Sequence, residues 1–247
     1  MAERKQVIAP RSAESVRLAL LAGHNADLGT AQDSFHVASH MVRSNDKSER
    51  NLVRPLVAEA TVAYGRCFTK SYVAGRTQLD KIITIPREHA AAHASLMRLR
   101  NSTVAHSESV LTPSFAIVEL QREQPEGAVR AVRASAMTVH PSYSAEAIDE
   151  FHALVRAVKQ VLLGEIERAK AALLARLAAE DLTALWDEGQ QPQLLSVSLD
   201  SWDIHSRRPD YPETNIIKVL VEPARTFLMP SSGDLFAPKI HREEGAI

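Results

Sequence analysis

The sequence has few of the residues that characterise several common classes of protein. Cys67 is the only cysteine among 247 residues, so no disulfide can form within the chain, which fits a reducing compartment. Glycine occurs only 9 times, too rarely for a turn-rich all-β fold. No run of about 18 apolar residues occurs, and the first residues lack the apolar segment of a secretory signal. We therefore expect a cytoplasmic protein with no membrane association.

Motifs for cofactors and metals are also missing. The sequence contains no glycine-rich phosphate loop, no serine nucleophile elbow and no zinc-ligand spacing, so we expect no cofactor and no metal. His36 and His40 stand at i,i+4, a spacing that can bind a metal, but no Glu lies between them in the required pattern. Exposed or capping histidines are the simpler interpretation.

The residues that are abundant favour helices. The hydrophobic fraction is 45%, enough for a sizeable core, and Ala, Leu, Arg and Glu fill long stretches of helical periodicity. These stretches cover residues 12–41, 51–68, 87–106 and 144–177, and the last of them extends to about 186. Between them, residues 115–121 and 128–140 alternate with a period of two, which predicts a β-hairpin. The sequence thus predicts a mainly α fold, an antiparallel helical bundle with an inserted hairpin at about 115–140.

The details of these stretches predict helix starts and core residues. Ser12 and Ser144 are expected to cap the first and fourth helices, and Pro55 is expected in the first turn of the second. The apolar positions of the fourth helix that follow helical spacing are Ile148, Phe151, Leu154, Val155, Val158, Leu162 and Ile166.

The ends of the chain differ from the helical region. We expect residues 1–11 to be a flexible start and residues 12–186 to form the helical domain. Residues 187–247 hold six of the 12 prolines and read as an irregular extension. Two short apolar runs there, 194–199 and 216–221, could be strands.

Charge is unevenly distributed along the chain. Residues 1–110 hold 15 Lys and Arg against 10 Asp and Glu, whereas the remainder holds 14 against 20. A basic first half is compatible with a polyanionic partner such as RNA, and chance unevenness is the alternative.

One segment carries a recognisable chemical pattern. In LRNSTVAHSE, Arg100 is followed by Asn101 and, after four more residues, by His106. This pattern resembles the defining motif of the HEPN superfamily, in which an Arg, a polar residue, a spacer and a His stand late in a core helix. Upstream, the segment YGRCF (64–68) is similar to the aromatic–Arg–Phe segment that ends an earlier helix in the same group. The resemblance covers roughly residues 12–186.

The resemblance implies metal-independent RNA cleavage. In such a reaction His106 would act as general base or acid, since histidine titrates near neutrality. Arg100 would bind two phosphate oxygens through its planar guanidinium group, and Asn101 would orient the Arg or the phosphate. The alternative is that Arg100 is a solvated helix charge and that His106 caps a helix C-terminus.

The spacing of the motif bears on oligomeric state. On a regular α-helix, six positions rotate by about 600° and rise by about 9 Å, so Arg100 and His106 would lie about 120° apart. One helix would therefore not bring both groups to one point. HEPN ribonucleases resemble one another in lining a shared cleft with the motif helices of two protomers, and we expect a two-fold homodimer here.

Three further residues are candidates for binding the substrate. Arg66 is expected either as a second cation in the cleft or in an ion pair with Glu59 or Glu88. His89 and His93 stand at i,i+4 just before the motif, and they are expected to line the same cleft.

Two functions follow from the resemblance. The first is an endoribonuclease, such as a toxin or antiviral effector, with a neutralising antitoxin or another protein as a partner. The second is a non-catalytic HEPN module that binds RNA or acts as a protein scaffold.

Overall fold

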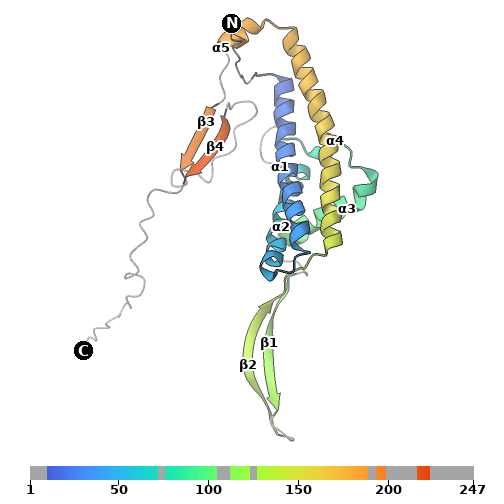
Figure 1. Cartoon of the computed structure of the whole chain (residues 1–247), viewed down its shortest axis with the longest axis vertical. Helices are drawn as coiled ribbons and strands as arrows, with labels where there is room; N and C mark the ends of the chain where they lie inside the picture. Colours follow the sequence, from blue (N-terminus) through green and yellow to red (C-terminus); the bar gives the residue numbers. More distant parts are fainter. Residues whose placement is uncertain are drawn as a thin grey trace, which may run out of the picture.

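The chain folds into a mainly helical body with a two-stranded antiparallel ribbon, and this coarse prediction is confirmed (Figure 1). The structure is a computed structural model. It describes residues 10–71, 76–104, 112–122, 127–188, 193–198 and 216–222. The predictions for 1–11 and for most of 187–247 therefore lie largely outside the described residues.

Three helices form the body of the molecule. They are α1 (Ala13–Met41), α2 (Lys47–Phe68) and α4 (Ala145–Ala178), and α1 packs against both of the others. Figure 1 shows α1 and α4 side by side along most of their length.

Ion pairs at both ends of the α1–α4 contact show that these helices are antiparallel. Glu14, at the start of α1, pairs with Arg176 near the end of α4 at 2.8 Å. At the other end, Arg43, just after α1, pairs with Asp149 in the first turns of α4. All four side chains are partly exposed, so these pairs fix the register of the helices and add little stability.

Side-chain caps start the three long helices. Ser12 forms a capping box with Ser15, and the Ser144 hydroxyl accepts a hydrogen bond from the Ala147 amide, so both predicted caps are confirmed. In addition, the Asp46 carboxylate accepts a hydrogen bond from the Ser48 amide at 2.8 Å. This third cap starts α2 four residues earlier than the sequence predicted.

The earlier start changes the place of Pro55. Because α2 begins at Lys47, Pro55 stands in the helix interior, so its predicted place in the first turn was wrong. An interior proline costs about 3 kcal/mol, because it removes one hydrogen bond and crowds the preceding turn. Burial of Val53 and Val57 on either side offsets that cost.

The core lies between α1, α2 and α4. All seven predicted apolar residues of the fourth helix are buried, which confirms that prediction. Phe35 of α1 meets Phe151 of α4 with ring centroids 5.8 Å apart. Each fully buried large apolar side chain contributes about 1.5–3 kcal/mol, so this shared core accounts for most of the stability of the body.

The predicted third helix is divided into several parts. It comprises η2 (Arg87–His89), α3 (Ala90–Leu99) and η3 (Arg100–Val104), and η3 is a π-helix. A further short helix, η1 (Leu79–Lys81), precedes them. Leu96 is buried, and both α3 and η3 contact α2.

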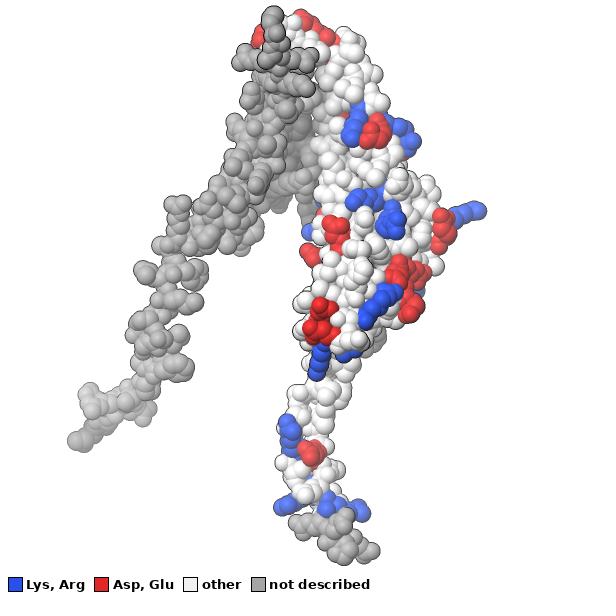
Figure 2. Space-filling view, viewed as in Figure 1, with Lys and Arg blue, Asp and Glu red and all other residues white. Residues whose placement is uncertain are grey.

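The predicted hairpin is present as β1 (Ser114–Arg122) and β2 (Val129–Thr138). The strands pair antiparallel, with an irregularity in register between Glu119 and Leu120. Every side chain of β2, and all but one of β1, is exposed, so the ribbon does not pack against the helices. Basic side chains stand toward its outer end in Figure 2.

The last described elements are short. The long helix α4 ends at Ala178, and α5 (Leu182–Glu188) is a separate helix, so the predicted continuation to about 186 was wrong. The two apolar runs of the extension are strands, β3 (Gln193–Ser198) and β4 (Ile216–Glu222), which pair in parallel. None of the helices in the described part of the chain has the length and apolarity that crossing a membrane requires.

Candidate functional site

The Arg100 side chain packs against α2 at Gly65, the only residue of that helix without a side chain. A Cβ placed on Gly65 would stand 2.9 Å from Cγ of Arg100 and 3.3 Å from its Cδ and Nε. Real Cβ atoms essentially never make a contact as short as 2.9 Å, so only glycine at position 65 lets the arginine stem take this path. The contact joins Gly65, in the first segment that carries the resemblance, to Arg100, the first residue of the second.

The guanidinium of Arg100 is held by an amide and not by a carboxylate. Its Nη1 donates a hydrogen bond to Oδ1 of Asn101 at 3.0 Å. Among the described residues, no carboxylate lies within ion-pair distance of it. No carboxylate of the described residues therefore neutralises the positive charge of the guanidinium, and its remaining N–H groups can donate to an anion.

The backbone of the motif is not a regular α-helix. Residues 100–104 form a π-helix directly after α3. The rotation of about 120° between Arg100 and His106 assumed an unbroken α-helix, so that premise was wrong. Single π-helical turns are frequent at functional sites, where they place side chains that a regular helix would direct elsewhere. His106 lies outside the described residues.

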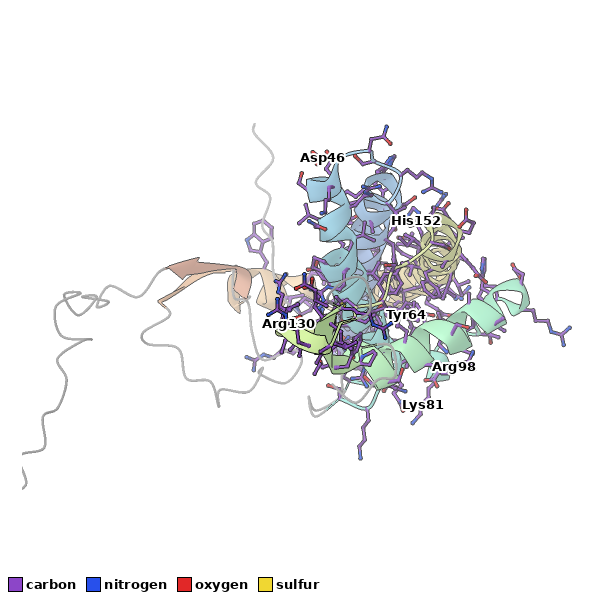
Figure 3. All side chains as sticks on the ribbon, turned by 90° about the horizontal axis from the view of Figure 1, so that it is seen from below. Asp46, Tyr64, Lys81, Arg98, Arg130 and His152 are labelled. Carbon is purple, nitrogen blue, oxygen red and sulfur yellow. The ribbon has the colours of Figure 1, made fainter. Side chains whose placement is uncertain are left out.

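His93 lies on the same side of α3 as Arg100 and is tied to α2. Its Nδ1 lies 2.7 Å from the Tyr64 hydroxyl, and its ring contacts Phe68 with centroids 4.8 Å apart. Figure 3 shows Tyr64 where α2 meets α3. Burial lowers the pKa of His93 and raises that of Tyr64, so both side chains are neutral near pH 7, and the tautomer of the imidazole decides which of them donates.

These contacts give His93 a structural role that the sequence did not predict. His93 and Arg100 are seven residues apart, about two turns, and both face α2. His89 stands at the N-cap position of α3 without a capping hydrogen bond. The structure therefore brings His93 to the helix that Arg100 contacts, whereas within the described residues the His89 side chain makes no hydrogen bond, ion pair or ring contact with that helix.

Arg66 is paired with a residue of α1. Its Nε lies 3.1 Å from Asp27 of α1, and the same carboxylate also pairs with Arg76. The sequence left open a cleft cation or an ion pair with Glu59 or Glu88, and the partner in the structure is Asp27. One carboxylate faces two guanidinium groups, so this cluster of three side chains keeps a net positive charge.

Tyr64 and Gly65 belong to the site although the sequence pattern did not mark them. Both lie within the segment 64–68, where only Arg66 was expected to bind substrate. Gly65 itself was a signal. Glycine in a helix interior costs about 1 kcal/mol relative to alanine, so its presence indicates that another part of the chain approaches the helix closely.

Three histidines come together elsewhere. The rings of His36 and His40 are 4.7 Å apart, and His152 of α4 lies 5.7 Å from His36. Within the described residues, no group of three or more His, Cys, Asp or Glu side chains is arranged to hold a metal ion.

Comparison with known proteins finds no relative of this chain. The chain matches no protein-family model, and no curated protein or solved structure is detectably similar to it. The resemblance to HEPN proteins therefore rests on the motif residues of this chain.

Proposed function

We propose that this protein is a metal-independent endoribonuclease of the HEPN type, in which Arg100 and His106 act on a phosphodiester of RNA. The observation that carries the proposal is the contact of Arg100 with Gly65. It supports the view that the two segments of the resemblance form one site, with a cation that no carboxylate of the described residues neutralises.

The chemistry needs three roles. A base removes the proton of the ribose 2′-hydroxyl, a cation stabilises the charge that builds on the phosphate, and an acid protonates the leaving oxygen. Arg100 suits the cationic role, because it stays charged and Asn101 orients it. His106 suits the roles of base and acid.

A single chain offers one such histidine for two proton transfers. In a two-fold dimer, two motif segments would share one cleft and supply two histidines, so the homodimer is part of this proposal. A toxin or antiviral effector of this kind would also need a neutralising partner.

Incubation of the purified protein with structured RNA in EDTA tests the proposal. Cleavage should persist in EDTA and should be lost in His106→Ala. Arg156→Ala, which removes an exposed arginine of α4, is the matched control and should cleave normally. Binding without cleavage by the wild-type chain would instead favour the non-catalytic RNA-binding module.

A further inference from the structure

A second basic surface lies on α2, at the opposite end from Gly65. A surface pocket of about 420 Å³ is formed by the first half of α2, by Val42 after α1, and by residues 140–143 between β2 and α4. None of its lining residues is acidic. Two arginines of α2, Arg50 and Arg54, line it together with His140.

The cations of this pocket are available for a ligand. Arg50 and Arg54 are exposed, and neither has an ion-pair partner in the described part of the chain. The nearby Asp46 attracts Arg50 electrostatically, but its carboxylate forms no ion pair with either arginine and accepts hydrogen bonds from Ser48 as the cap of α2. The pocket therefore offers two guanidinium groups to a ligand, and its lining contains no carboxylate.

Neutral polar groups complete the lining. Asn51, Ser142 and Tyr143 add amide and hydroxyl donors around the arginines. Burial raises the pKa of the Tyr143 hydroxyl while nearby Arg54 opposes that rise, so the hydroxyl stays protonated at neutral pH and can donate. Arginine forks with hydroxyl and amide donors suit the oxygens of a phosphate group.

The position of the pocket relates it to Arg100. Arg54 and Gly65 are eleven residues apart on α2, which is about three turns plus 20° and about 17 Å. Arg54 and the Gly65–Arg100 contact therefore lie on the same side of the helix. At the pocket end, the Pro113 carbonyl accepts a hydrogen bond from the Val139 amide, next to His140, so Pro113, which follows η3 in the chain, lies close to the pocket.

We propose that this pocket binds a backbone phosphate of the same RNA strand on which Arg100 acts, a few nucleotides from the cleaved bond. The inference rests on the proposed function for the identity of the strand. A free nucleotide has the same phosphate chemistry, so the experiment has to separate the two sources.

Binding of a 2′-O-methyl RNA dodecamer to the wild-type chain provides the test, because this RNA has no free 2′-hydroxyl and cannot be cleaved. The double variant Arg50→Ala/Arg54→Ala should bind about 10-fold more weakly. Its plot of log affinity against log salt should be shallower by about 0.7 for each phosphate that the protein no longer neutralises.

Two control variants separate the pocket from charge and packing in general. Arg156→Ala removes an arginine outside the pocket and should leave the affinity and the salt slope near the wild-type values. Arg50→Gln/Arg54→Gln keeps polar side chains that can donate hydrogen bonds but removes the charge, so it should bind as weakly as the alanine pair.

The outcomes distinguish the two proposals. Wild-type affinity and an unchanged salt slope in a folded double variant would overturn the phosphate pocket. Competition by AMP with an affinity equal to that of the dodecamer would also overturn it, in favour of a nucleotide pocket. A pocket-dependent affinity in a protein that cleaves no RNA would uphold the pocket and overturn only the ribonuclease.

Discussion

The stem of Arg100 occupies the space in which any side chain at Gly65 would have to stand. The distance of 2.9 Å from Cγ to an added Cβ means that Gly65→Ala must push the arginine into another path. We expect the rate of RNA cleavage to fall about 10-fold, because a displaced Arg100 guanidinium would stabilise the charge on the phosphate less well.

The same substitution should not unfold the protein. Alanine is favoured over glycine by about 1 kcal/mol within a helix, and this offsets the cost of moving one partly exposed side chain. The control is Gly164→Ala on α4, where an added Cβ meets nothing within 4 Å. It should raise the free energy of unfolding by about 0.5–1 kcal/mol and leave cleavage unchanged. Equal cleavage by both variants would show that the path of Arg100 over Gly65 has no functional role.

Tyr64→Phe tests the link between α2 and α3. The change removes the hydroxyl that bonds to His93 but keeps the ring that packs on Phe68. We expect a loss of about 1 kcal/mol in the free energy of unfolding, the usual net value of one hydrogen bond. Urea titration followed by circular dichroism measures it. A stable variant with strongly reduced cleavage would instead place the hydroxyl in the chemistry.

Stability should decrease in mild acid because of His24. Burial lowers its pKa below 6.5, and although a hydrogen bond from Nε2 to the Thr77 carbonyl opposes the shift, nearby Arg76 assists it. Below about pH 6.5 the unfolded chain takes up a proton that the folded chain resists. The free energy of unfolding therefore falls as pH drops, by at most about 1.4 kcal/mol per pH unit for this residue.

His24→Gln removes the titrating group and keeps an N–H that can reach Thr77. The urea concentration at the midpoint of unfolding should decrease as the pH is lowered from about 7.5 to 5.5, and this decrease should be smaller in the variant than in the wild type. The pKa values of His93 and His152 are shifted in the same direction, so some decline should remain. An identical decline in both proteins would exclude His24 as a source.

Much of the fold could be predicted from the sequence because it depends on short-range patterns. Helical spacing in the fourth helix marked the residues that are buried, and period-two alternation marked the hairpin. The start of α2 was missed although Asp46 and Glu49 stand at capping-box spacing, and the misplacement of Pro55 followed from that error.

The candidate site was harder to predict because it depends on contacts between helices. The sequence pattern marked Arg100, but its contact with Gly65 joins positions 35 residues apart and becomes visible only when α3 and η3 lie on α2. The π-helix at 100–104 has no composition signal, so a rotation calculated for a regular helix did not apply. The partner of Arg66 lies on α1 at Asp27, a long-range pairing that local spacing does not indicate.

Analysis of the RNA ends left by the wild-type protein tests the central claim most directly. If Arg100 and His106 promote attack by the 2′-hydroxyl of the substrate, the products carry a 2′,3′-cyclic phosphate and a 5′-hydroxyl, and DNA of the same sequence survives. Arg100→Ala and His106→Ala should each lower the rate at least about 100-fold, and Arg100→Lys should restore it only in part. Full activity of His106→Ala with the same product ends would contradict the account.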